Sequence, residues 1–528
     1  MTRAIVIGAG IGGSAAALLL AKSGLKTTLL EKNPRIGGSC SGYTKHTALG
    51  DFHCDIGTHM FCRGDKGPLG EVLRRVGHGG VIPFRRTRDI AELRTVGADG
   101  VLNRIPVPAR LHRMPAFSVQ MARALDLSPR EMIEVGRLFT HILTMSDDAV
   151  VALDHVTVED FVAPYANAEA VLSVFAFLLG LYFVLPYWEV SAGEALWCFR
   201  RMALDNSLSY PVGGSIAIPR TYCDLAESYG AVVRVNTGVK RIVVEANRVR
   251  GVLTSEGEML EAEVVISTSS LRTTVLGLVG EDVFPTWYVD RIRGLKASHI
   301  AVQAKIGLDA KLVAPGAIVG GVGHTDLFRL RGDRLKDMYR CVESGRVPDV
   351  VPFYCPVPTN FDPGLAPNGC QLLTVCAVAP TSDVGLVDRP ELWEKAMMHA
   401  LRTVVPGLDA HTVFIDKFSV KFIERWIGKE FGPAISTGQT PDQVGARRPP
   451  VFTPVTGLYA AGCCAGARGV GTELAAASAM MCADRVLADL GRLIQRPPER
   501  GRRRNRIVRQ LVRPVSWATA ASVGPLVG

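Results

Sequence analysis

The N-terminal segment RAIVIGAGIGGSAAALLLAKSGLKTTLLEKN restricts the possible fold more than any other part of this chain. The apolar run Arg3–Ile7 predicts a buried parallel strand, and a helix is predicted over residues 14–23, ending before Gly24. A second strand is predicted over Lys26–Leu30, and it ends at Glu31. Together these elements form a βαβ unit whose first turn is rich in glycine.

The turn contains the spacing G-x-G-x-x-G at Gly8, Gly10 and Gly13. Gly8 allows a tight turn, Gly10 lets the backbone approach a pyrophosphate, and Gly13 lets the helix pack closely on the strand. The helix N-terminus attracts the phosphates, and an acid at the end of the second strand accepts the ribose hydroxyls. Because Glu31 stands at that place, the segment predicts a dinucleotide-binding site.

Later segments appear in an order that is typical of one group of flavoproteins. Arg35, Gly37 and Gly38 give R-x-G-G, and CDIGTHMF follows at residues 54–61. Next come SYPVGGSIAIPR and the strand-rich stretch after it. They are followed by DPGLAPNG and finally by GLYAAG with a glycine loop. In this order and spacing the chain resembles the amine-oxidase superfamily, and within it the phytoene desaturases, carotenoid isomerases and retinol saturases. The resemblance covers about residues 1–495.

The resemblance implies an α/β fold with a discontinuous Rossmann-like FAD-binding domain and an α+β substrate domain. Residues 1–85, 210–285 and 450–495 are expected to form the FAD-binding domain, and residues 86–209 and 286–449 the substrate-binding domain. Residues 496–528 are expected to form a basic C-terminal tail.

The cofactor implied by the resemblance is FAD, and no metal site is expected. The residues expected to contact FAD are Gly8, Gly10, Gly12, Gly13, Glu31, Lys32, Arg35, Gly37, Gly38, Ser39, Val239, Gly462, Cys463, Gly471 and Thr472. His59, which the family pattern places near the flavin ring, and Glu473, in the first turn of the last helix, are the catalytic candidates. Either could relay a proton, and a structural role for each stays open.

The sequence favours a long apolar substrate. Residues 170–188 carry no charge, but we expect Gly180 and Pro186 to interrupt this stretch. We therefore expect a buried helix that lines an apolar tunnel, or one at a membrane surface, rather than a membrane span. HIAVQAKIGLD and LLTVCAVAP predict strands over the same pocket. We therefore expect an FAD-dependent desaturase or dehydrogenase that transfers a hydride from an isoprenoid or carotenoid-like lipid to flavin N5. A saturase or isomerase of the same family, an amine oxidase and a non-catalytic escort of prenyl lipids are the alternatives.

Charge and cysteine usage limit the partners and the compartment. The net charge of +10 is concentrated after residue 495, where the chain has eight arginines and one glutamate. This tail is either solvated or binds anionic lipid head groups, with the apolar side chains Ile507, Val508, Leu511, Val512 and Trp517 at the interface. Nucleic acid binding is not expected, because the rest of the chain has no basic footprint. With no charged leader before Arg3 and no CxxC among twelve cysteines, we expect a cytoplasmic protein. The apolar helix and the basic tail predict that it associates peripherally with a membrane.

The adjacent cysteines Cys463 and Cys464 raise the alternative of a redox pair. A disulfide between neighbouring residues closes a strained ring, and no partner motif suggests a metal. Cys463 stands where many relatives of the family have an aspartate. We expect it to be a small residue that packs against the cofactor.

Overall fold

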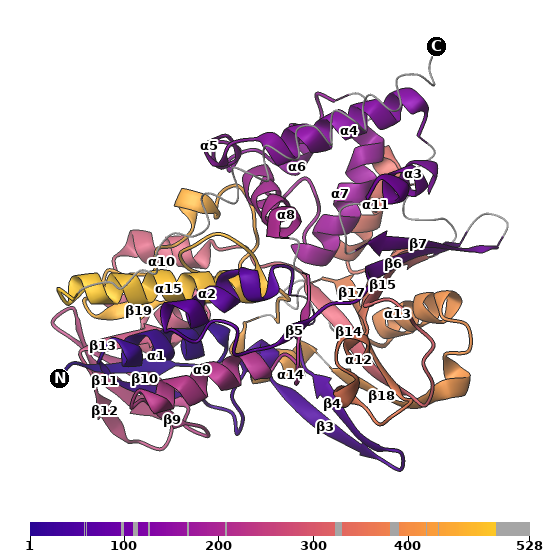
Figure 1. The fold of residues 1–528 in the computed structure, drawn as a ribbon. Helices are drawn as coiled ribbons and strands as arrows, with labels where there is room; N and C mark the ends of the chain where they lie inside the picture. The colour runs from indigo at the N-terminus through magenta and orange to yellow at the C-terminus, as the bar shows by residue number, and fades with distance from the viewer. Residues whose placement is uncertain are drawn as a thin grey trace.

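Two β-sheets and a layer of helices organise the chain (Figure 1). The computed structural model describes residues 1–57, 59, 61–96, 100–108, 114–124, 127–165, 168–205, 208–322, 330–380, 390–418, 420–430 and 432–492. The basic tail predicted over residues 496–528 therefore lies outside the described residues.

The first sheet is parallel and has the strand order β19-β13-β1-β2-β9. Its strands are β1 (Arg3–Ile7), β2 (Lys26–Leu30), β9 (Val232–Arg234), β13 (Val264–Ser267) and β19 (Leu458–Ala460). They come from three distant parts of the chain, each within one of the three segments predicted for the FAD-binding domain. The exact boundaries of that domain stay a prediction.

Helices cover one face of this sheet, and α1 packs between α9 and α15 (Figure 1). The helices are α1 (Ile11–Lys22), α2 (Pro68–Arg75), α9 (Ala217–Ser228) and α15 (Gly471–Asp489). The helix predicted over residues 14–23 begins three residues earlier, at Ile11. The reason is that α1 starts directly after Gly10, so that Gly12 and Gly13 already belong to its first turn.

An antiparallel meander and two short helical elements cover the opposite face. The meander consists of β10 (Val239–Glu245), β11 (Arg248–Thr254) and β12 (Met259–Glu261). The helical elements are the π-helix Thr273–Val279 and α10 (Thr286–Arg293). Ile242, Val249 and Val252 pack on Ile5 and Ile7, so the parallel sheet is buried on both sides, as its apolar strands predict.

The second sheet has seven strands in the order β18-β14-β17-β16-β15-β6-β7. All neighbours are antiparallel except β15 and β6, which run parallel. The strands are β6 (Asp89–Val96), β7 (Leu102–Pro108), β14 (Ile300–Leu308), β15 (Ala317–Val322), β16 (Val351–Pro356), β17 (Gln371–Ala379) and β18 (Thr412–Phe418). The two strands predicted from HIAVQAKIGLD and LLTVCAVAP are β14 and β17, which pair with each other. Helix α13 (Pro390–Val404) packs against this sheet through Trp393, Met397 and Leu401.

A helical layer lies beside the second sheet (Figure 1). It contains α3 (Met114–Ala124), α4 (Pro129–Thr144), α5 (Asp147–Val151), α6 (Val158–Val162), α7 (Ala168–Tyr182), α8 (Ala192–Asp205) and α11 (Gly332–Glu343). Shorter elements join the layers: the hairpin β3 (Gly42–Thr47) and β4 (Gly50–Asp55), the pair β5 (Phe84–Arg85) and β8 (Tyr210–Pro211), α12 (Pro358–Phe361) and α14 (Val420–Ile423).

The apolar stretch 170–188 forms most of α7 and the irregular segment after it. Phe175, Ala176 and Leu179 are buried among other helices, which fits the buried alternative. Gly180 does not interrupt the helix, contrary to expectation; the helix ends at Tyr182, and Val184 takes a positive φ of 54°. Among the described helices, none combines the length and the apolar character that a bilayer crossing requires.

Candidate active site

The glycine turn and Glu31 meet at the carboxyl ends of β1 and β2. Gly8 has a φ of 94°, and a Cβ at Gly13 would lie 1.8 Å from the carbonyl oxygen of Gly8. The helix and strand can therefore approach each other only because residue 13 is glycine. The carboxylate of Glu31 is buried, and it accepts the backbone N–H groups of Ala9 at 2.8 Å and Asn33 at 3.0 Å. Glu31 is thus fixed beside the turn.

The R-x-G-G segment folds back onto this turn. The N–H of Gly37 donates to the carbonyl of Ala9 at 2.8 Å, and Gly37 and Gly38 have φ values of 118° and 55°. A Cβ at Gly10 would lie 3.9 Å from Gly38, so the two glycine turns face each other with little between them. Arg35 is exposed and donates to the carbonyl of Gly42 at 3.1 Å.

The remaining predicted contacts lie at the two ends of this region. Ser39 accepts the N–H of Gly57 through its carbonyl, and Lys32 donates from Nζ to the carbonyl of Arg425. Val239 begins β10 close to Lys32, because a Cβ at Gly238 would lie 3.7 Å from the Cβ of Lys32.

The glycine loop between β19 and α15, called the closing glycine loop, reaches the two glycine turns from the other end of the chain. A Cβ at Gly12 would lie 3.3 Å from the Cα of Gly462, whose N–H donates to the hydroxyl of Ser478 at 3.1 Å. Gly471 and Thr472 open α15, so the N-termini of α1 and α15 lie side by side. No side chain caps either N-terminus, so the first N–H groups of both helices are available to an anion. This arrangement suits the binding of a dinucleotide, because it combines two uncapped helix N-termini, two glycine turns and the fixed carboxylate of Glu31.

The two adjacent thiols point to different groups. Cys463 Sγ donates to the carbonyl of Gly471 at 3.2 Å, whereas Cys464 Sγ lies 2.9 Å from the hydroxyl of Ser436. Burial raises the pKa of the Cys463 thiol above its usual value, which keeps it in the thiol form. Packing of Cys463 against the cofactor stays a prediction.

A buried polar cluster surrounds His59 at the interface between the two halves of the molecule. His59 Nε2 lies 2.7 Å from Nζ of Lys305 on β14, and Lys305 also donates to Oε1 of Gln303 at 3.0 Å. Nδ1 of His59 lies 4.0 Å from Oδ2 of Asp55, and the other carboxylate oxygen of Asp55 accepts the hydroxyl of Ser215 at 2.8 Å. Lys305 has no solvent exposure at all.

The electrostatics of this cluster follow mainly from desolvation. Burial lowers the pKa of Lys305 to about 8 and raises the pKa of Asp55 to about 6. The pKa of His59 falls well below its usual value, first because the ring is buried and second because Lys305 is cationic. His59 is therefore neutral at physiological pH, and Lys305 can gain or lose a proton close to it.

Lys305 was not among the residues predicted from the sequence. The signal was present, because a lysine stood in the middle of a strand whose other residues, apart from Gln303, are apolar or small. Burial of both faces of β14 turns that lysine into an internal group, and this depends on contacts between distant segments.

Glu473 forms a second buried acid–base group, and it contacts the backbone at Arg63, four residues after His59. Its Oε1 accepts the backbone N–H of Arg63 at 2.8 Å, and the guanidinium of Arg63 pairs with Asp205 at 2.6 Å. Burial raises the pKa of Glu473 to about 7, although the charge of Arg63 opposes this. The structure thus brings Glu473 into contact with Arg63, four residues from the other catalytic candidate, His59.

A buried ion network ties the closing loop to helix α8. Glu194 has no exposed surface; it accepts the N–H of Gly469 at 2.6 Å and pairs with Arg468 at 3.2 Å and Arg448 at 3.5 Å. Arg468 also pairs with Asp154. This network was not predicted from the sequence, because its members lie far apart along the chain.

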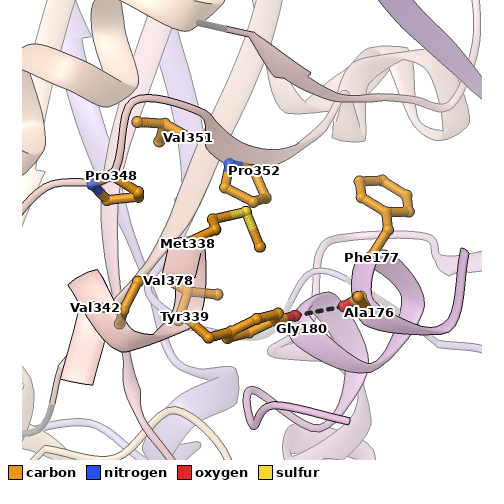
Figure 2. A pocket seen from close by; sticks show the side chains of 10 residues that line it. All are labelled: Ala176, Phe177, Gly180, Met338, Tyr339, Val342, Pro348, Val351, Pro352 and Val378. Atoms are coloured by element: carbon orange, nitrogen blue, oxygen red, sulfur yellow. Dashed lines mark hydrogen bonds between the residues drawn. The ribbon is translucent and has the colours of Figure 1, made fainter. Parts of the chain in front are cut away.

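A small cavity separates α7 and α11 from β16 and β17 (Figure 2). Its volume is about 20 Å³, which is room for about one water molecule. Figure 2 shows apolar side chains around it, with the hydroxyl of Tyr339 donating to the carbonyl of Ala176. This cavity is too small for a lipid, and the large apolar cavity expected from the sequence stays a prediction.

The chain is similar to flavin-dependent oxidoreductases and to enzymes that act on carotenoids. Residues 11–487 match the family model described as flavin containing amine oxidoreductase. The chain is 23% identical to the phytoene desaturase of Fusarium fujikuroi over 444 residues, covering 77% of this chain and 74% of the relative. It is 24% identical to the chloroplastic prolycopene isomerase of Daucus carota, covering 94% of this chain and 81% of the relative. A crystal structure of an oxidoreductase from Methanosarcina mazei has the same fold, with a TM-score of 0.68 and 18% identity over 90% of this chain and 99% of that chain.

Proposed function

This chain belongs to the flavin containing amine oxidoreductase family, and from this premise we propose that it oxidises a long apolar isoprenoid. It is an FAD-dependent oxidoreductase with relatives among the carotenoid desaturases and isomerases. The escort alternative is therefore set aside. The proposal concerns the substrate and the reaction: desaturation of a carotenoid-like chain by removal of a hydride and a proton from neighbouring carbons.

Bound FAD supplies the acceptor for the hydride, a two-electron step that side chains cannot perform. We propose that Glu31 holds the ribose hydroxyls and that the N-terminal N–H groups of α1 hold the pyrophosphate. Gly462 and Gly471 would let the backbone approach the flavin end. The arrangement described above supports this assignment, because it combines glycine turns with uncapped helix ends.

The observation that carries the proposal is a pair of buried groups that can hold a proton: Lys305, which is hydrogen-bonded to His59, and Glu473, which accepts the N–H of Arg63. Desaturation releases a proton as well as a hydride, so the site needs a base in a dry environment. Glu473, with its pKa raised to about 7, is suited to accept that proton near neutral pH. We propose that Lys305 and Asp55 hold the neutral ring of His59 in one orientation, with Nε2 accepting from Lys305.

The redox direction is tested with the purified yellow holoprotein under anaerobic conditions. Incubation with phytoene should bleach the flavin absorption, and a more conjugated polyene should appear in the extract. Reoxidation of the dithionite-reduced protein by a conjugated polyene would instead make it a saturase. A change of double-bond geometry without net bleaching would make it an isomerase, and bleaching by amines alone would make it an amine oxidase.

We further propose a cytoplasmic enzyme that binds membranes peripherally through its basic tail. The eight arginines after residue 495 support this. Sedimentation with vesicles that contain anionic lipid should retain the full chain and lose a chain that ends at residue 495. Equal retention of both would contradict a role for the tail.

A further inference from the structure

One turn from the second half of the molecule is bonded to both flanks of the R-x-G-G segment in the predicted cofactor site. The π-helical turn Glu424–Gly428 follows α14, which lies beside the β3–β4 hairpin (Figure 1). The indole N–H of Trp426 donates to the hydroxyl oxygen of Ser41 at 2.8 Å. The carbonyl of Trp426 accepts from Nδ2 of Asn33 at 2.8 Å, and the carbonyl of Arg425 accepts from Nζ of Lys32.

These three contacts end on both sides of the R-x-G-G segment. Lys32 and Asn33 precede it, and Ser41 follows it. The same turn also contacts Gly38–Cys40, so it lies against the part of the segment that contains Gly38.

Each attachment also leads to a residue of the predicted cofactor site through one further hydrogen bond. The backbone N–H of Asn33 donates to Oε1 of Glu31 at 3.0 Å. The hydroxyl of Ser41 donates to the carbonyl of Gly38 at 2.7 Å. Trp426 thus helps to fix both the acid and the glycine pair.

The turn itself is anchored in the second sheet. Trp426 stacks on Phe422 with ring centroids 5.7 Å apart, and Phe422 packs on Phe418 at 5.1 Å. Phe418 ends β18 and contacts the ring of Tyr43 on β3 at 5.6 Å. On the same strand, Asp416 accepts from the hydroxyl of Tyr43 at 3.0 Å. This row of rings gives the turn a rigid base.

We propose that the Glu424–Gly428 turn is a latch that closes over the bound cofactor and slows its release. FAD leaves only when the bonds from Lys32, Asn33 and Ser41 to the latch have opened. The inference depends on FAD as the cofactor and not on the identity of the substrate, so it can fail or hold independently of the proposed reaction.

The test is the rate at which the holoprotein loses FAD after gel filtration, followed by the fluorescence of released FAD. Trp426→Phe keeps the ring stacked on Phe422 and removes only the N–H donor, and Asn33→Ala removes the second attachment. Each variant should release FAD about fivefold faster, the factor that one ordinary hydrogen bond contributes. Trp287→Phe, at a tryptophan that is 61% exposed on α10, is the matched control and should leave the rate unchanged.

A third variant separates the latch from a general loss of stability. Ser41→Ala removes the acceptor for Trp426 and should also release FAD faster. The melting temperature of each variant without FAD should stay within about 1 °C of wild type. Unchanged release rates in Trp426→Phe and Asn33→Ala would overturn the proposal, as would faster release that only accompanies a comparable loss of stability in the FAD-free protein.

Discussion

At the scale of single residues, Glu473 links the pH dependence of activity to its burial. We expect Glu473→Gln to lower the rate of flavin reduction by a factor of about 10²–10⁴, the contribution of a positioned general base. In the wild type this rate should rise with pH through about 7, because the carboxylate accepts the proton. Anaerobic stopped-flow at several pH values measures both effects. A rate in Glu473→Gln equal to wild type would exclude Glu473 as the base.

The same residue should make the fold less stable as pH rises. The folded pKa of Glu473 is about 7, whereas the ordinary value is 4.5, so between these pH values the folded chain holds a proton that the unfolded chain has released. The free energy of unfolding therefore falls by up to about 3 kcal/mol from pH 4.5 to pH 7. Urea titrations of wild type and Glu473→Gln should show this fall only in wild type, and parallel curves would contradict it.

Lys305 should have the opposite dependence. Its folded pKa of about 8 lies below the ordinary 10.5, so between pH 8 and pH 10.5 the unfolded chain binds a proton that the folded chain lacks. Stability consequently rises with pH in this window, and the full desolvation cost applies below pH 8. Lys305→Met should abolish the rise and should be about 2 kcal/mol more stable than wild type at pH 7.

Thermal unfolding at pH 7 and pH 10 tests this expectation. Lys240→Met, at an exposed position of β10, is the control and should behave like wild type. Destabilisation of Lys305→Met at pH 7 would mean that the hydrogen bonds of Lys305 to His59 and Gln303 outweigh its desolvation.

What the sequence could predict at this scale depended on how local the physics is. The contacts around Gly8, Gly13 and Glu31 arise within one βαβ unit, so spacing alone indicated them. The role of Lys305 arises where β14 meets His59, a residue 246 positions away in the chain. No pattern within either segment contains that contact.

At the scale of elements, helix packing makes two glycines respond oppositely to the same substitution. In α7 a Cβ at Gly180 would lie 2.6 Å from the hydroxyl of Tyr339, which is itself bonded to the carbonyl of Ala176. Gly180→Ala should therefore destabilise the fold by about 1–3 kcal/mol. In α4 a Cβ at Gly136 meets nothing within 4 Å, so Gly136→Ala should stabilise by up to about 1 kcal/mol.

Chemical denaturation of both variants tests the comparison, since the change in sequence is identical and only the neighbours differ. Stabilisation by Gly180→Ala would show that Tyr339 moves away at little cost.

Element boundaries were harder to predict than element types. The strands β14 and β17 were predicted from their apolar alternation, because strand patterns are local. In the stretch 170–188, Gly180 read as an interruption, but the glycine is required by the close approach of Tyr339 from α11. A glycine that breaks a helix and one that admits a neighbour look the same in a sequence.

At the scale of the whole molecule, two distant parts of the chain are joined by charges that the sequence did not indicate. Glu194 on α8 meets the N–H of Gly469, 275 positions later, together with Arg468 and Arg448. The order of motifs predicted which segments build the parallel sheet. It did not predict which side chains hold the helical layer against the closing glycine loop, because complementary charges at such separations leave no spacing signal.

This network leads to the last prediction, that Glu194→Gln weakens both the fold and the cofactor site. The substitution leaves Arg448 and Arg468 without their shared buried counter-charge, and breaking such a pair costs about 3–5 kcal/mol. Because Gly469 belongs to the loop that positions Gly471 and α15, FAD should also bind more weakly. Urea unfolding of the FAD-free protein measures the first effect, and titration with FAD under native conditions measures the second. Glu245→Gln, in an exposed pair with Arg250, should change neither. Normal FAD affinity in a destabilised Glu194→Gln variant would mean that Glu194 supports the helical layer alone and that the loop keeps its shape without it.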